Sequence, residues 1–496
     1  MMQFGPSAGV WMLLLLALVI VLTGLPVWAL LIGIASAFAV TAMAAGNLDF
    51  GILAALPARI VGLLEHDLLQ ALPLYVFIGI LLQRLTLADV LFSSLKRVFH
   101  GTGAGGSLAA LSVGALIAPM NGSVASSSAL LARLVAPRLS KMNAAGATAL
   151  VSVAATIGVV VPPSLVLILL GDAMLRAHTE ASNLPGYVLG SQRIINTQDV
   201  FHAALLPALC VLLLWTLVVW WHGRKLSGDD LPNGQNLPQL AISFVVVLAI
   251  VVLLGAVFTG KMYAVEAAAS GGVLLCVGAI ASRALHWSQW QEVLLDTLKL
   301  SGAIFALLVG ASTFSLVFRL LGTDRWIAEL VLNSSLSPRL VAVLVLVTVA
   351  LCAWVLDAFE MIFVVIPIVA PPLIAKLGDA QQAAVLLLLV LQLSFLIPPM
   401  GYAVLMARSR AGLGSVRTVA LVRALLPFVV AQCAVTAIVF MLPWTVHQLD
   451  APPTLLADPS ARSVQDIDQQ MRDMALQNDA SEEQAPSPDQ LRETDK

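Results

Sequence analysis

Apolar runs long enough to cross a lipid bilayer recur along the chain and constrain its fold more than any other feature. A helix needs roughly 20 apolar residues to cross the hydrocarbon core. The segments that meet this requirement lie at about 10–25, 26–45, 71–87, 143–171, 200–221, 239–258, 263–282, 299–321, 381–407 and 418–442. The sequence therefore predicts an all-α polytopic membrane protein with about ten transmembrane helices.

Charge is too sparse to cover a water-exposed surface. Of the residues, 59% are hydrophobic and 11% charged, whereas soluble domains carry about 25% charged residues. The net charge of −2 provides no basic surface for nucleic acid. The four cysteines stand singly in apolar stretches, which indicates neither a zinc site nor a disulfide framework.

Two further apolar segments, about 104–132 and 340–375, carry polar residues in their middle. The first contains Asn121 to Ser123, and the second contains Asp357 and Glu360. Positive residues mark the cytoplasmic side of a membrane, and they flank the first segment at both ends. A re-entrant helical hairpin, which enters and leaves on one side, fits this pattern better than a span does.

The two halves of the chain repeat one spacing. In the first half, the spacing from Gly122 to Pro162 is one position shorter than the spacing from Asp357 to Pro398 in the second half. Proline in mid-membrane breaks a helix, and non-helical backbone survives at that depth only where it is buried or lines a cavity. One proline pair alone often means a kink, and one Gly/Ser-rich stretch often means a close helix contact. The duplicated spacing instead favours two inverted-topology repeats with ion sites at the breaks.

Composition divides the chain into five parts. The polar stretch 223–238 separates the halves, and Arg176 to Asp199 reads as a loop outside the membrane. Residues from about Asp450 are rich in Asp, Glu, Gln and Ser, which is typical of disorder. The predicted parts are scaffold spans (1–70), a first repeat (71–222), a linker (223–238), a second repeat (239–442) and a disordered acidic tail (443–496).

Several local motifs are shared with a known family. They are LPLYVFIGILL from Leu72, ATIGVVVPPS from Ala155, YAVEAA from Tyr263, LDAFE from Leu356 and SFLIPPMG from Ser394. The sequence resembles the large membrane subunit of tripartite ATP-independent periplasmic (TRAP) transporters, the DctM-type permease, over roughly residues 10–442. The Asp357-x-x-Glu360 form is closest to the subgroup labelled mannitol/chloroaromatic-type.

The resemblance implies an elevator-type carrier in the bacterial inner membrane, and not an enzyme. It implies coupling to Na⁺ and import of a small organic acid. It also implies two partners, a periplasmic solute-binding protein and a separate small four-helix membrane subunit of DctQ type.

The resemblance also implies which residues bind the sodium ions. The first sodium site maps to Asn121, Gly122, Ser123, Ser126 and Ser127 at the hairpin tip with Gly158, Val161 and Pro162 at the break. The second maps to Ala353, Ser394, Ile397 and Met400. The family often has Thr where Ile397 stands, so this site departs from the pattern. Ser164, Asp357 and Glu360 are the candidate solute ligands.

Three alternatives are open for an apolar chain of this kind, the first of them within the same broad class. A stand-alone Na⁺/carboxylate symporter would share the hairpins but need no binding protein. An intramembrane enzyme would need a His, Ser or Asp constellation deep in the bilayer, whereas the histidines here lie near span ends or in loops. A structural or docking protein would not require proline-broken helices.

Overall fold

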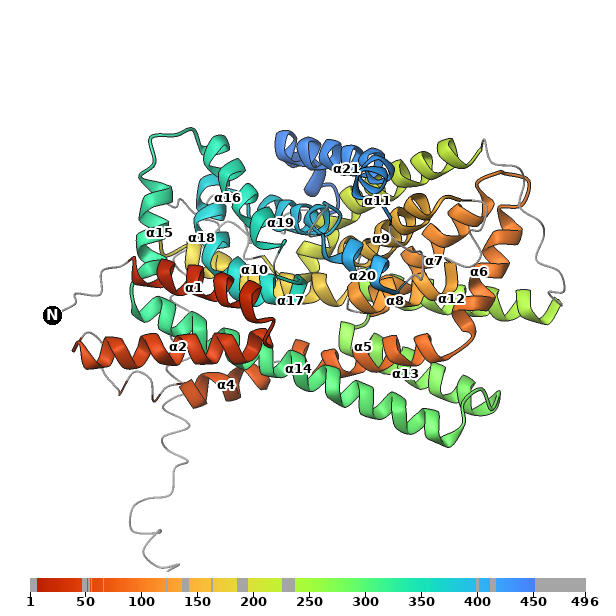
Figure 1. Cartoon of the computed structure of the whole chain (residues 1–496), viewed down its shortest axis with the longest axis horizontal. Coiled ribbons are helices and arrows are strands. Elements are labelled where there is room, and N and C mark those ends of the chain that lie inside the picture. The colour runs from red at the N-terminus through yellow and green to blue at the C-terminus, as the bar shows by residue number, and fades with distance from the viewer. Residues whose placement is uncertain are drawn as a thin grey trace, which may run out of the picture. The chain divides into compact units, whose positions relative to one another are not determined.

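The computed structural model confirms the predicted all-helical polytopic fold (Figure 1). It describes residues 7–46, 51, 54, 56–65, 67–121, 124–135, 142–161, 164–184, 195–224, 237–354, 356–397, 401–410 and 416–450. Within these ranges every regular element is a helix. Residues 1–449 form one compact unit, and 450–496 form a second.

The helices outside the two predicted hairpin regions pack mainly on one another. Their bounds are α1 Ala8–Thr23, α2 Val27–Ala44, α4 Leu56–Leu64, α5 Asp67–Arg84, α6 Leu87–Val98, α12 Leu237–Phe258, α13 Ala264–Ala281, α14 Trp287–Leu320 and α15 Thr323–Leu332. The long helix α14 packs on α2 and α5, and α5 packs on α13. Arg84 at the end of α5 pairs with Glu292 and Asp296 of α14.

The first hairpin region contains five helices. They are α7 Gly105–Asn121, α8 Val124–Val135, α9 Ala144–Val160, α10 Leu165–Ala181 and α11 Thr197–Gly223. The two arms α7 and α8 pack against each other, and both pack on α9. The chain then bends by 42° between α9 and α10, so a helix break lies between Val160 and Leu165.

The second hairpin region follows the same order. Its elements are α16 Pro338–Cys352, α17 Ala358–Glu360, the π-helical turn η2 Met361–Val365, α18 Ile366–Leu377, α19 Ala380–Ser394, α20 Tyr402–Arg410, α21 Thr418–Met441 and the 3₁₀ turn η3 Pro443–Val446. The arms α16 and α18 pack together, and both pack on α19. Helix α19 ends just before the second proline pair.

The repeat predicted from two landmarks extends to the helix boundaries. Helices α6 and α15 begin at Leu87 and Thr323. Helices α9 and α19 begin at Ala144 and Ala380, and these two residues are separated by the same number of positions as the first two. Each half also packs on a hairpin arm of the other half. Helix α10 of the first half packs on the arm α18, and helix α20 of the second half packs on the arm α8. In Figure 1 the four half-helices α9, α10, α19 and α20 lie together near the centre.

The described helices contain fewer full-length spans than the ten predicted. Six are long and apolar enough to cross a membrane, or up to eight if each bent pair is one span. Predicted spans at α1, α13 and α19 are shorter apolar helices. Conversely, Ala358–Leu377 in the second hairpin is long enough to cross by length and composition. Large apolar side chains such as Phe244 and Val245 are exposed on α12, as a lipid-facing helix requires.

Two predicted boundaries are wrong. Arg176 does not begin a loop, because α10 continues to Ala181. The predicted tail also begins too early, since Pro443–Val446 is helical and His447 pairs with Asp379 at 2.7 Å. The remainder of the predicted tail, 451–496, lies outside the described residues, as does most of the linker 223–238.

Candidate functional site

Helices α7 and α9 approach each other through small residues at matching spacing. A Cβ atom on Gly158 would lie 2.4 Å from the carbonyl of Ala118, and one on Gly114 would lie 2.6 Å from the carbonyl oxygen of Ala154. Gly158 therefore faces Ala118, which is four residues after Gly114. Gly114 in turn faces Ala154, which is four residues before Gly158. Only residues without bulk permit this backbone contact, which brings the first helix break close to the end of the first hairpin arm.

The first predicted sodium site is described in part. Gly122, Ser123 and Pro162 lie outside the described residues, and Asn121 is described only as the last residue of α7. Gly158 packs beside Ala118, three residues before Asn121. Val161 ends α9 in an extended conformation, with its N–H bonded to the carbonyl of Ile157. The contact between Gly158 and Ala118 therefore joins α9 to α7 a few residues before the predicted break and the predicted tip.

The serines of the first tip have different surroundings. Ser127 is buried, whereas Ser126 is half-buried and accepts a 2.5 Å hydrogen bond from Nε2 of Gln83 on α5. Arg133 on the same arm donates to the backbone carbonyl of Gln83 at 2.8 Å. Arm α8 is thus bonded to the end of α5, and Ser126 belongs to that contact.

Ser164 joins the two sides of the first break. It is fully buried, its Oγ accepts from the N–H of Leu167 at 3.1 Å, and its hydroxyl donates to the carbonyl of Val159 at 3.4 Å. It is the N-cap of α10, so its hydroxyl holds the broken helix and does not line the cavity described below.

The second break is joined by backbone hydrogen bonds. The N–H of Gly401 donates to the carbonyl of Ile397 at 2.9 Å, and that of Ala403 donates to Phe395 at 3.2 Å. A Cβ on Gly401 would lie 2.7 Å from the Phe395 carbonyl oxygen, so only glycine fits. Each of these carbonyls has a second lone pair.

The other residues of the second predicted sodium site lie beside this break. Ala353 ends α16 and Ser394 ends α19, and both are fully buried in helices that pack together. The Ser394 hydroxyl donates to the carbonyl of Val390 at 2.7 Å, which leaves its oxygen lone pairs free to accept. Met400 lies outside the described residues.

Asp357 and Glu360 form a reciprocal cap at the second hairpin tip. Oδ1 of Asp357 accepts from the N–H groups of Phe359 and Glu360 at 2.9 and 3.1 Å. Oε2 of Glu360 accepts from the N–H of Asp357 at 3.0 Å. This is a capping box, which the spacing Asp-x-x-Glu indicates in any sequence. One oxygen of each carboxylate makes these bonds, and neither residue lines the cavity described below.

The two broken helices touch at equivalent positions. Gln392 on α19 donates through Nε2 to the carbonyl of Thr156 on α9 at 3.2 Å, and these residues are 236 positions apart. Gln432 on α21 donates to Oε1 of Gln392 at 2.8 Å. Both glutamines are fully buried. Because the offset equals that of the repeat, this contact lies close to the axis that relates the two halves.

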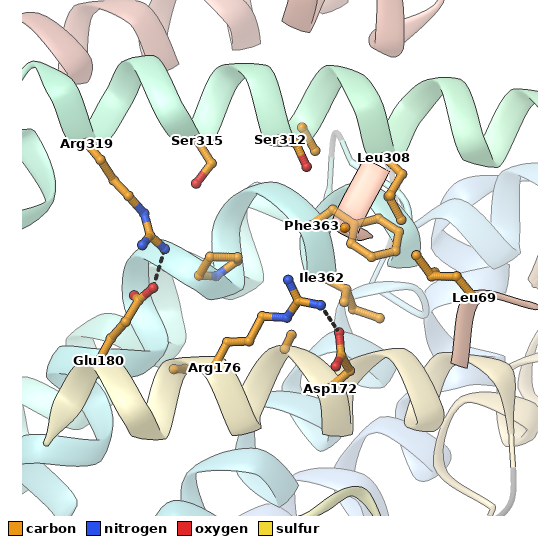
Figure 2. Close-up of a pocket in the computed structure, with 15 residues that line it drawn as sticks. Leu69, Asp172, Arg176, Glu180, Leu308, Ser312, Ser315, Arg319, Ile362 and Phe363 are labelled. Carbon is orange, nitrogen blue, oxygen red and sulfur yellow. Dashed lines mark ion pairs between the residues drawn. The ribbon is translucent and has the colours of Figure 1, made fainter. Parts of the chain in front are cut away.

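A cavity of about 200 Å³ opens between α10, α14 and the second hairpin. Figure 2 shows Leu308, Ser312, Ser315 and Arg319 on α14 facing Asp172, Arg176 and Glu180 on α10, with Ile362 and Phe363 of η2 beside them. Two ion pairs line it. Arg176 pairs with Asp172 at 3.0 Å within α10, and Arg319 pairs with Glu180 at 2.5 Å across the two helices.

Sequence reasoning missed these cavity residues because it ended the broken helix at 171. A signal was present, since Asp172, Arg176 and Glu180 are four residues apart and share one face of a helix.

Comparison with known proteins gives the family. Residues 14–445 match the family described as "Tripartite ATP-independent periplasmic transporter, DctM component". The sialic acid TRAP transporter large permease protein SiaM of Vibrio cholerae serotype O1 is 24% identical, over 85% of this chain and 93% of that protein. The isethionate TRAP transporter permease protein DctMQ of Oleidesulfovibrio alaskensis is 20% identical, over 83% of this chain and 62% of that protein.

The fold also matches a solved transporter. The crystal structure of the Alcanivorax borkumensis YdaH transporter, described as having an unusual topology, gives a TM-score of 0.57 at 14% identity, over 79% of this chain and 88% of that one. At this identity the likeness concerns the fold alone. The family match covers nearly the whole helical part of the chain. The chain therefore belongs to the DctM family of TRAP transporter large permeases, and it is a transporter subunit and not an enzyme.

Proposed function

We propose that this chain imports a small organic acid across the bacterial inner membrane in symport with Na⁺. The observation that carries the proposal is the pairing of each hairpin with a broken helix. In the first half Gly158 lies against Ala118, near the tip, and in the second half α16 ends beside α19. Carbonyls at such breaks are hard oxygen ligands that suit a sodium ion.

The proposed ion sites are those predicted from the sequence. The first uses the tip from Asn121 to Ser127 with Gly158 to Pro162, and the second uses Ala353, Ser394, Ile397 and Met400. Ile397 offers no hydroxyl, so the second site relies on backbone carbonyls and Ser394. Bound sodium offsets the charge of the solute and orders the tips. Asp357 and Glu360 keep one carboxylate oxygen each outside the capping bonds, so they remain proposed solute ligands, as does Ser164.

The proposed motion is that of an elevator. The two hairpins and broken helices form the moving part, and the hydrogen bond between Gln392 and Thr156 joins its halves. The helices α2, α5, α13 and α14 form the scaffold, which the Arg84 ion pairs to α14 hold together. A sodium gradient supplies about 2.3 kcal/mol per charge for each 100 mV of membrane potential.

The proposed partners are a periplasmic solute-binding protein and a small DctQ-type membrane subunit. The chain covers 62% of the relative called DctMQ. The relatives named for sialic acid and isethionate suggest a hydroxylated organic anion as solute. The likeness to the mannitol/chloroaromatic-labelled subgroup names no tested substrate.

Reconstitution tests this function. The chain, the small subunit and the binding protein encoded beside it are placed in proteoliposomes, and uptake of labelled organic acids is measured with an inward sodium gradient. We expect uptake that needs both sodium and the binding protein. Equal uptake with a potassium gradient would contradict the sodium coupling. Sodium-dependent uptake by the chain alone would support the stand-alone symporter instead.

A further inference from the structure

The cavity between α10 and α14 brings two polar helix faces together. On α14, Ser312, Ser315 and Arg319 are separated by three and four residues and so share one face. On α10, Arg176 and Glu180 share another. Figure 2 shows both faces directed toward the same space. Because α14 is otherwise mainly apolar, this polar face marks a place where the helix contacts something other than lipid.

Packing stability does not explain this arrangement. Charged groups between apolar helices cost free energy, and an ion pair replaced by well-packed apolar residues is often as stable or more so. Helices held together for stability also pack at crystal-like density. Here a cavity of about 200 Å³ remains beside the charges, and one water takes up roughly 30 Å³ in the liquid. The space therefore suits a small organic molecule.

The arginines keep donors available for such a molecule. A guanidinium has five N–H donors in a planar fork. The ion pairs use Nη2 of Arg176 toward Asp172 and Nη2 of Arg319 toward Glu180. The remaining donors match a carboxylate or sulfonate, while the Ser312 and Ser315 hydroxyls match solute hydroxyls. Phe363 provides an apolar wall.

The ion pair between Arg319 and Glu180 joins two different helices, whereas the pair between Arg176 and Asp172 lies within α10. Arg319 belongs to α14 and Glu180 to α10, so this pair joins the proposed scaffold to the proposed moving part. Glu180 presents to Arg319 the same carboxylate chemistry that an acidic solute carries. A solute acid group that binds Arg319 must therefore compete with Glu180.

We propose that this cavity is a binding site for a hydroxylated organic anion, in which Arg319 and Arg176 hold the acid group and Glu180 competes with it for Arg319. The proposal rests on the proposed function in taking an organic acid as solute. Binding of the anion releases the ion pair between α10 and α14, so the arrival of solute loosens one contact that opposes movement.

A thiol placed in the cavity tests the site without knowledge of the solute. Ser315→Cys is made in the full chain after Cys210, Cys276, Cys352 and Cys433 are replaced by Ser or Ala. The thiol is reacted with a sulfonate-bearing and a trimethylammonium-bearing methanethiosulfonate, and each rate is divided by its rate with free cysteine. We expect the sulfonate reagent to be favoured.

Two further substitutions separate competition from simple structural pairing. Arg319→Gln should lower the normalised sulfonate rate about tenfold, as loss of one charged hydrogen bond implies. Glu180→Gln should raise it several-fold, because it frees Arg319. Either substitution also changes the local charge, which alone would alter the sulfonate and trimethylammonium rates by equal and opposite factors. Equal and opposite changes would therefore overturn the proposal, whereas a sulfonate change clearly larger than the trimethylammonium change supports it. A sulfonate rate that neither substitution changes would also overturn it.

Two matched controls involve the same helix α14, one on it and one paired to it. Ser288→Cys, exposed near the start of α14, should show no dependence on Arg319. Arg84→Gln removes a comparable ion pair to α14 outside the cavity and should leave the rates at Ser315→Cys unchanged.

Uptake by the reconstituted complex provides a second measurement. Arg319→Gln should raise the half-saturating solute concentration at least tenfold, whereas Arg84→Gln should not. Sodium-dependent uptake that is indifferent to Arg319 would refute the site and leave the proposed function intact. Uptake without sodium dependence would instead refute the proposed function, whatever the thiol rates show.

Discussion

The two halves of the molecule build the same arrangement by different chemical means. In the first half, Gly114 and Gly158 let α7 and α9 meet through their backbones. At the positions that the repeat makes equivalent to Ala154 and Gly158, the second half has Val390 and Ser394. The first break is closed by the side chain of Ser164, and the second by backbone hydrogen bonds around Gly401.

The comparison shows that the two halves share their helix order although their local side-chain contacts differ. The order of helices and the exchange of contacts persist in both halves, although Ala154 and Gly158 of the first half are replaced by the larger Val390 and Ser394 in the second. Conversely, only the second hairpin tip has a carboxylate cap among the described residues. The first half should therefore be sensitive to added volume, and the second to the loss of polar groups.

The largest effect should come from volume added to the first half. Gly158→Val places side-chain atoms against the Ala118 backbone, where even a Cβ would lie 2.4 Å away. We expect a loss of about 3 kcal/mol or more in unfolding free energy, seen as a lower midpoint in thermal unfolding in detergent. Gly33→Val on α2 is the control, because a Cβ there meets nothing within 4 Å. Equal midpoints for both variants would refute the packing difference.

Loss of the carboxylate cap should have the next largest effect. Asp357→Ala removes the acceptor for two backbone N–H groups and should cost about 1–2 kcal/mol in thermal unfolding. Asp357→Asn keeps an acceptor and should cost less. Sodium-dependent uptake adds a functional comparison, because Asn removes the charge while keeping the cap. Full uptake by both variants would remove Asp357 from the solute ligands.

A smaller effect is expected where the halves meet. Gln392→Leu removes the donor to the Thr156 carbonyl and the acceptor for Gln432. Because Gln432 still donates to the Leu389 carbonyl at 3.3 Å, we expect a cost of about 1 kcal/mol. Thermal unfolding of Gln392→Leu, Gln432→Leu and the double variant measures the coupling. Additive losses would mean that the two glutamines act separately.

The smallest stability change is expected at Ser394. Its hydroxyl bonds its own helix at Val390, so Ser394→Ala should cost about 0.5 kcal/mol or less. Sodium dependence of uptake should nevertheless weaken if the Ser394 oxygen is an ion ligand. Ser152→Ala is a matched control, because that buried serine also bonds its own helix, at Thr148. An unchanged sodium requirement would confine the second site to carbonyls.

The features that follow from covalent chemistry are predictable from the sequence. Proline disfavours the helix interior, so breaks near Pro162 and Pro398 and their common spacing can be predicted without a structure. A proline pair alone is not sufficient, because Pro371 and Pro372 lie inside the continuous helix α18.

Side-chain roles at those breaks cannot be predicted in this way. Ser164 is predicted as a solute ligand. The structure adds that its hydroxyl bonds Val159 and Leu167, contacts that depend on the angle between two half-helices.

The cavity is harder to predict, because its two faces come from distant parts of the chain. Arg176 and Glu180 belong to α10, whereas Arg319 belongs to α14. Reading Arg176 as a loop residue hides the periodic charges of α10. For Asp357 and Glu360, the spacing that suggests a ligand pair is also that of a capping box, and only coordinates show that the capping bonds are made.

The length of α14 has a consequence for how an anion reaches Arg319. Its 34 residues at about 1.5 Å each extend roughly 50 Å, well beyond a hydrocarbon thickness of about 30 Å. A rod of that length must either lean steeply or project into the headgroup layer. Arg319 is next to the final residue of α14, so its guanidinium lies near the boundary between membrane and water. An anion can therefore reach Arg319 without first losing its hydration shell in the hydrocarbon core.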